Sequence, residues 1–194
     1  MSTAAGDPER AVNGLLSVAQ LLEEPRLARL YTFVLREGPV TIDDIVETLE
    51  LPRTTAYSDA GTLVDLGVLT RDDEDKTHTY AAISILLTAN LDGDEYTITP
   101  TLIDAFGRSK RDRDLDLLLE RHGRGKLAAA ITYAIPYANG EMTERVAARE
   151  LDLQPAFAIA VLQSLRDVVR SMETVDPYLD EIRNARNQAP ASEE

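Results

Sequence analysis

Apolar residues recur at spacings of three and four along the first 50 positions, and this pattern predicts three consecutive amphipathic helices. The first helix should end before Pro25, and Gly38-Pro39 should end the second. The third should begin after Thr41, an N-cap residue that forms a weak capping box with Asp44. The apolar stripes of the three helices are Val12, Leu15, Leu16 and Ala19, then Leu27, Leu30, Tyr31 and Val34, then Ile42, Ile45, Val46 and Leu49.

A fourth helix is expected after the turn Leu51-Pro52, with Pro52 at its first position, and it should run to about Leu66. Its buried face is predicted to consist of Ala56, Ala60, Leu63 and Gly67. Four short strands should follow, at Val68–Arg71, Thr77–Ala82, Ile83–Leu87 and Glu95–Thr99. The order helix, turn, helix, strand, acidic loop, strand over residues 41–80 is that of a winged helix-turn-helix, which presents one helix to the major groove of DNA.

The C-terminal half is predicted to be helical. Thr99-Pro100 should start a helix that ends near Gly107, and a charged segment at 108–126 leads to further helices. Residues 126–169 repeat features of the first half at a spacing of 102 residues, with Thr143, Leu151, Ala158 and Leu165 matching Thr41, Leu49, Ala56 and Leu63. This repetition suggests a degenerate second helix-turn-helix, and chance similarity between two Ala- and Leu-rich segments is the alternative.

The fold class is therefore mainly α with a small β-wing: a winged helix-turn-helix followed by a helical C-terminal domain. We expect an N-terminal helix with a disordered start at 1–24, a winged-helix DNA-binding domain with extra strands at 25–99, a helical assembly domain at 100–186 and a disordered tail at 187–194.

The exposed start of the fourth helix carries the candidate DNA contacts. Short hydroxyl side chains suit base edges and phosphates, and an arginine at a helix start can reach a guanine or a phosphate. The candidates on this helix are Arg53, Thr54, Thr55, Tyr57, Ser58 and Thr62, and Gly61 would allow close backbone approach. On the wing, Lys76 and His78 are the candidates, with Arg71 nearby. The alternative is a polar helix face that only meets solvent.

This segment also resembles a known group of proteins. The stretch LPRTTAYSDAGTLVDLGVLTR is similar to the recognition helix and first wing strand of archaeal winged-helix regulators of the TrmB, IclR and ArsR-like kind, and the whole chain resembles haloarchaeal winged-helix proteins. The resemblance implies a DNA-binding transcription regulator. Many relatives have a basic residue after the tyrosine, whereas this chain has Ser58-Asp59, and we expect Asp59 to cap or orient Arg53.

Charge changes the expected binding conditions. The chain has 34 acidic and 20 basic residues, a formal charge of −14, and only three of its basic residues are lysines. Such a charge repels nucleic acid, but an acid-rich, lysine-poor composition is typical of proteins from cells with molar salt, where the Debye length is about 3 Å. An acidic protein that binds another protein is the alternative. The basic segment at 108–126 is expected either to contact phosphates or to pair with its own acids.

Other kinds of function have little support. The chain lacks cysteine, has two histidines and contains no nucleotide-binding or hydrolase motif, so we expect no enzyme activity, no metal site and no cofactor. No apolar run is long enough to span a membrane and no leader sequence is evident, which predicts a cytoplasmic protein without membrane contact. Double-stranded DNA is the expected partner, and the sequence identifies no small-molecule effector. The competing function is a protein-interaction module on a winged-helix scaffold that does not bind DNA.

A homodimer is expected, because residues 155–172 form a helix that is apolar nearly all round and has to be buried. The predicted dimerisation residues are Phe157, Ile159, Val161, Leu162 and Leu165, together with the helix around Val12–Ala19. The alternative is a helix buried in the core of a monomer.

Overall fold

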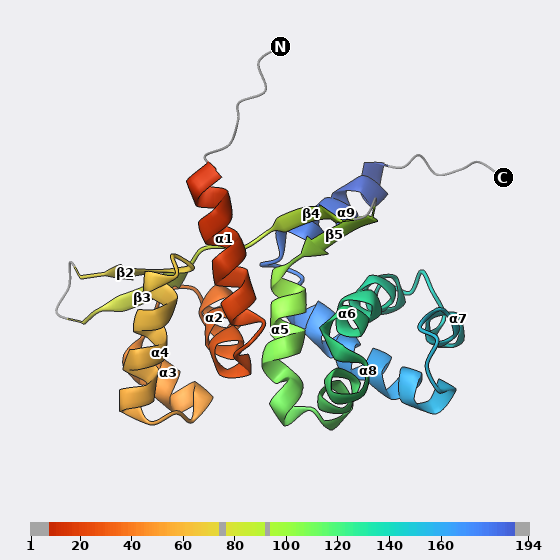
Figure 1. Cartoon of the computed structure of the whole chain (residues 1–194), viewed down its shortest axis with the longest axis horizontal. Helices are drawn as coiled ribbons and strands as arrows, with labels where there is room; N and C mark the ends of the chain where they lie inside the picture. The colour runs from red at the N-terminus through yellow and green to blue at the C-terminus, as the bar shows by residue number, and fades with distance from the viewer. Residues whose placement is uncertain (1–7, 74–76, 92–93, 189–194) are drawn as a thin grey trace, which may run out of the picture.

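The computed structural model describes residues 8–73, 77–91 and 94–188. The elements lie in a row, with the sheet of β2 and β3 at one end, α6 to α8 at the other, and α5 between them (Figure 1). The first five elements are α1 (Pro8–Leu21), α2 (Pro25–Glu37), β1 (Val40–Thr41), α3 (Ile42–Leu49) and α4 (Arg53–Asp65). Then come β2 (Leu69–Asp72), β3 (Thr79–Ala82), β4 (Leu87–Leu91), β5 (Asp94–Ile98) and α5 (Pro100–Arg108). A 3₁₀ turn (Ser109–Arg111) leads to α6 (Arg113–Ala138), α7 (Glu144–Glu150), α8 (Pro155–Met172) and α9 (Pro177–Gln188).

The helix-turn-helix forms as the sequence predicts. Thr41 caps α3, and the full capping box with Asp44 is present. Ala56, Ala60 and Leu63 of α4 are fully buried. Gly67 corrects the prediction, since it is exposed and follows α4 with φ of 70°, a left-handed conformation that suits glycine. Pro52 was predicted to be the first residue of this helix, but it is the N-cap, one position before α4 begins.

The wing is an antiparallel sheet in the order β1-β3-β2, with Val40 opposite Tyr80 and Leu69 opposite Ala82. The short strand β1 was not predicted, because two residues carry no alternation of their own. β4 and β5 form a separate antiparallel pair. The mainly helical architecture with a small wing is thus confirmed.

The predicted strand at Ile83–Leu87 is wrong for residues 83–86, which connect the two sheets. The buried Tyr31 replaces a strand partner there: its hydroxyl donates to the carbonyl of Ile83 at 3.0 Å and accepts from the amide of Ile85 at 3.1 Å. Ile83 and Leu86 are exposed, so the alternating apolar pattern does not mark a buried strand face.

The second helix-turn-helix is also present in the backbone. Gly38 and Gly140, and Glu50 and Asp152, are pairs of residues with positive φ, and each pair is separated by 102 residues. In each unit, the carbonyl at the end of the first of the two helices accepts a hydrogen bond from a basic side chain of the helix before it. The Leu49 carbonyl accepts from Arg29, and the Leu151 carbonyl accepts from Lys126. The repetition predicted from the sequence is therefore structural, with α7 and α8 matching α3 and α4.

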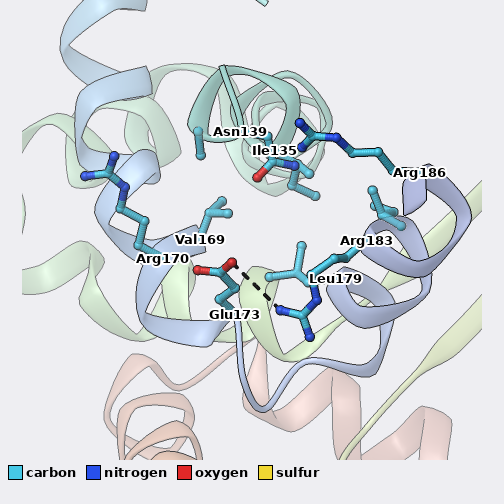
Figure 2. A pocket seen from close by; sticks show the side chains of 10 residues that line it. Ile135, Asn139, Val169, Arg170, Glu173, Leu179, Arg183 and Arg186 are labelled. Carbon is cyan, nitrogen blue, oxygen red and sulfur yellow. Dashed lines mark ion pairs between the residues drawn. The ribbon is translucent and has the colours of Figure 1, made fainter. Parts of the chain in front are cut away.

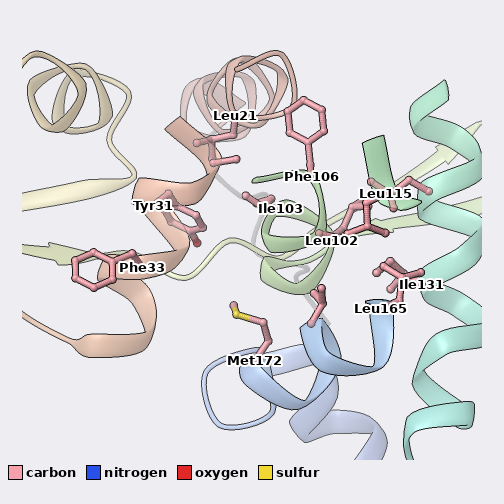
Figure 3. Close-up of a cluster of buried hydrophobic side chains, with 14 of the residues drawn as sticks. Leu21, Tyr31, Phe33, Leu102, Ile103, Phe106, Leu115, Ile131, Leu165 and Met172 are labelled. Atoms are coloured by element: carbon pink, nitrogen blue, oxygen red, sulfur yellow. The ribbon is translucent and has the colours of Figure 1, made fainter. Parts of the chain in front are cut away.

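The two helix-turn-helix units share one core, because α5 packs against α2 on one side and against α6 and α8 on the other. Gly107 permits the contact with α2: a methyl group there would lie 2.7 Å from the backbone nitrogen of Arg29. Figure 3 shows how side chains of α2, α5, α6 and α8 meet in this core, among them Tyr31, Ile103, Leu115 and Leu165.

A buried carboxylate reinforces the same junction. Asp104 of α5 is 2% exposed and accepts from Thr32 and Arg36 of α2, at 2.8 and 2.9 Å. Its second oxygen lies 2.7 Å from Arg108 and 3.3 Å from the Ser171 hydroxyl of α8. A buried charge with this many donors is well compensated, so Asp104 ties α2, α5 and α8 together.

Candidate nucleic-acid interface

The first turns of α4 present the predicted recognition face to solvent. Arg53, Thr54 and Ser58 are exposed, and the Tyr57 side chain is 46% exposed although it is aromatic. Thr55 is half-buried. Thr62 is half-buried as well, and its hydroxyl donates to the Ser58 carbonyl of its own helix at 2.9 Å. The structure therefore brings Arg53, Thr54, Tyr57 and Ser58 together as exposed side chains, and Thr55 and Thr62 lie at the edge of this face.

Arg53 has two neighbours. Its guanidinium forms an ion pair with Asp43 of α3 and lies over the ring of Tyr57, 5.7 Å from the ring centre. Tyr57 and then Asp43 raise the pKa of Arg53 above its ordinary value, so the side chain keeps its positive charge. Asp43 was not among the predicted site residues, and its position at the start of α3, opposite the start of α4, was the only signal.

Asp59 corrects one prediction. It does not orient Arg53: its side chain is buried and forms a two-bond ion pair with Arg26 of α2, at 2.6 and 3.1 Å. The same hydrogen bond raises the pKa of Arg26. Because Arg26 already neutralises Asp59 inside the fold, this carboxylate does not present an uncompensated negative charge beside the recognition face.

The described candidate residues of the wing also lie beside a carboxylate. Arg71 Nε and His78 Nδ1 lie 2.8 and 2.7 Å from the same carboxylate oxygen of Asp73. This arrangement lowers the pKa of Asp73, with Arg71 the largest cause. Lys76 lies outside the described residues. Within the described part of the wing, Arg71 and His78 therefore both lie beside one carboxylate.

Several cations of the basic segment at 108–126 make contacts within the chain, but among the described residues only Lys110 pairs with an acid of that segment. Lys110 pairs with Asp116 at 2.7 Å and Arg111 with Glu50 at 3.2 Å. Arg124 donates to the carbonyl of Leu22 at 2.6 Å, which joins α6 to the end of α1. These side chains connect elements of the fold.

Three of the five predicted dimerisation residues lie in the core of the chain itself. Val161, Leu162 and Leu165 have no exposed area, because α8 packs against α6 and α5. The prediction of a dimer contact through these three residues is wrong, since they are covered within one chain. Phe157 and Ile159 are partly exposed and also pack on this core, and Phe157 stacks on His122.

Two other predictions concern absences. No helix of residues 8–73, 77–91 and 94–188 is both long and apolar enough to cross a membrane. Across these same ranges, no group of three or more histidine, aspartate and glutamate side chains is placed to hold a metal ion.

An exposed recognition-type helix beside a small antiparallel wing defines the winged helix-turn-helix class. Residues 27–85 match the family described as sugar-specific transcriptional regulator TrmB, and this segment is similar to the helix-turn-helix domain of that family. The match indicates a DNA-binding transcriptional regulator. Residues 109–174, which contain the second helix-turn-helix, match a family of unknown function, DUF7437. Neither the curated proteins nor the solved structures contain a match to the chain.

Proposed function

We propose that the chain is a sequence-specific DNA-binding transcription regulator of a halophilic archaeon, and that it binds DNA as a homodimer through its winged helix. The observation that carries this proposal is the exposed face at the start of α4, where Arg53, Thr54, Tyr57 and Ser58 lie together. Arginine and hydroxyl side chains at this place can contact base edges, and the adjacent wing faces the flanking phosphates. The TrmB-family match to residues 27–85 supports the same function.

The ion pairs of this surface support binding at high salt. Arg53 is held beside Asp43, and Arg71 beside Asp73, so few cations are free to displace counterions from DNA. The formal charge of −14 repels DNA strongly in dilute buffer, and molar salt screens that repulsion. A halophilic source accounts for both features.

We assign the dimer contact to α1. Val18 and Leu21 of this helix are buried against the chain, and Ser17 donates to the Leu66 carbonyl at 2.6 Å. Leu15 and Leu16, by contrast, are 49% and 61% exposed, on a helix that projects beyond the body of the molecule (Figure 1). Two such helices that bury these leucines against each other would place two copies of α4 on one DNA duplex, in successive major grooves about 34–36 Å apart.

A protein-interaction module is the second candidate function. The observation that favours it is that Arg53, Arg71 and His78 each lie beside a carboxylate. A mobility shift of the DNA upstream of the chain's own gene, measured at near-molar KCl with unrelated DNA as competitor, separates the two functions. A specific shift supports the regulator, and no shift at any salt concentration supports the interaction module.

A matched pair of variants assigns the shift to the recognition face. Arg53 and Arg149 are both exposed arginines paired with one carboxylate, but Arg149 lies on α7. Arg53→Ala should weaken the specific shift, whereas Arg149→Ala removes the same charge and should leave it unchanged.

A further inference from the structure

A cavity lies between α6, α8 and α9, and we propose that it binds a small organic anion: a carboxylate or phosphate attached to a compact apolar body. The cavity has a volume of about 280 Å³. Its polar lining consists of Asn139, Arg170, Glu173, Arg183 and Arg186. The inference does not depend on DNA binding, because the site lies in the C-terminal half and its occupancy can be measured on the protein alone.

The charge of the lining is the first argument. Carboxylates outnumber basic residues in the chain by 34 to 20, yet the cavity is lined by three arginines and one glutamate. Guanidinium groups form a fork of donors that matches carboxylate and phosphate oxygens. Arg183 and Arg186 also pair with carboxylates just outside the cavity, Asp180 and Glu141, so Arg170 is the lining cation left to attract an anion from solution.

The pairing of these arginines leaves donors available. The Arg183 guanidinium lies 3.8 Å from Glu173, too far for a hydrogen bond, and it also pairs with Asp180. Arg186 pairs with Glu141 at 2.9 Å. Arg170 forms no ion pair or hydrogen bond within the part of the chain that the structure describes. One guanidinium therefore has all its donors free of protein partners, and a second is only loosely held by Glu173.

The shape of the site selects the rest of the ligand. Figure 2 shows Asn139 and Arg186 on one side of the cavity and Glu173 and Arg183 on the other. Ile135, Val169 and Leu179 come from α6, α8 and α9 and supply apolar parts of the lining. A ligand with an anionic end and a small aromatic or branched aliphatic body satisfies both kinds of surface. The volume of about 280 Å³ lies just below the range of about 300–1,000 Å³ typical of ligand pockets, which favours a small ligand.

Binding of benzoate and phenyl phosphate to the full chain, measured by calorimetry at constant ionic strength without DNA, tests the proposal. At least one of the two should bind at this site, and the better probe identifies whether carboxylate or phosphate is preferred. Benzyl alcohol is the neutral control for benzoate, and its binding should be at least about tenfold weaker because it lacks the charge-assisted hydrogen bonds.

Three variants locate the site. Arg170→Gln and Arg183→Gln should each weaken binding about tenfold. Glu173→Gln should strengthen binding, since it removes the carboxylate that competes for Arg183 and repels the ligand. Arg149→Gln on α7 makes the same charge change as the arginine variants outside the cavity and should have no effect. The proposal is overturned if neither anion binds, if benzyl alcohol binds as tightly as benzoate, if Arg149→Gln weakens binding as much as Arg183→Gln, or if Glu173→Gln leaves the affinity unchanged.

Discussion

Arg53, the first residue of α4, forms an ion pair with Asp43, the second residue of α3. The two helices of the helix-turn-helix are thus linked across the turn by the side chain that is proposed to read DNA. To contact a base or a phosphate, Arg53 must exchange this carboxylate for the DNA. Asp43 therefore holds Arg53 at the helix start and competes with the DNA for it.

This relationship predicts opposite effects of two substitutions. Arg53→Ala should weaken specific DNA binding roughly ten- to hundredfold if the contact to a base is bidentate. Asp43→Asn should strengthen binding about two- to fivefold, because an exposed ion pair is weak and its loss frees Arg53. Affinities from mobility shifts at one fixed salt concentration measure both, and weaker binding by Asp43→Asn would contradict the competition.

The affinity for DNA should depend only weakly on salt concentration. Because the described cations of this surface are held by carboxylates, few counterions are released on binding, and the logarithm of affinity should fall only slowly with the logarithm of salt concentration. Titration of KCl in the mobility shift measures the slope. A steep slope, like that of a protein with 6–10 phosphate contacts, would contradict this prediction, because it requires more cations on the DNA than this surface supplies.

The oligomeric state should depend on α1. Leu15→Asp combined with Leu16→Asp should convert dimers to monomers, because charges replace the exposed leucines of the proposed contact. Val146→Asp is the matched control, since Val146 is an exposed apolar residue on α7. Light scattering at high salt measures the mass, and a monomeric unmodified protein would rule out the dimer.

Gly107→Ala should destabilise the junction between α2 and α5. The added methyl would lie 2.7 Å from the Arg29 nitrogen, and overpacking of this kind costs about 1–3 kcal/mol of unfolding free energy. Gly125→Ala is the control, because a methyl at this helical position has nothing within 4 Å and should be neutral or stabilising. Denaturant unfolding compares the two, and equal stability of both variants would show that α2 and α5 adjust freely.

Tyr31→Phe should cost about 1–3 kcal/mol, since it leaves the Ile83 carbonyl and the Ile85 amide without their partner. Burial raises the pKa of Tyr31 above its ordinary value of 10.0. The folded state thus favours the neutral phenol, and this contribution to stability is complete below pH 10 and decreases as the pH rises above it. Unfolding measured across alkaline pH should show a smaller loss for Tyr31→Phe than for the unmodified chain, and equal losses would contradict this role of Tyr31.

Local sequence signals predicted the parts of the fold that depend on local chemistry. The cap at Thr41 and the buried small residues of α4 are encoded within a few positions of where they act. The ion pair of Asp59 was mispredicted because its partner, Arg26, is distant in sequence and meets it only after folding. The connector at 83–86 shows the alternation of a strand, but the hydroxyl of Tyr31 binds its backbone instead.

The dimer contact predicted through α8 failed for a different reason. A helix that is apolar nearly all round has to be covered, but its sequence does not say whether the covering surface belongs to the same chain. Here α6 and α5 cover it, so Val161 and Leu165 stabilise the monomer. The exposed pair Leu15 and Leu16 was assigned to the apolar stripe of the first helix, and only the structure separates these residues from the buried Val18 and Leu21.

A footprint of the upstream DNA at near-molar KCl, made with the unmodified chain and with the variant Arg53→Ala combined with Ser58→Ala, tests the central claim most directly. We expect the unmodified chain to protect a discrete site, and the double variant to lose that protection while it stays folded by circular dichroism. An unchanged footprint for the double variant would contradict recognition by the start of α4.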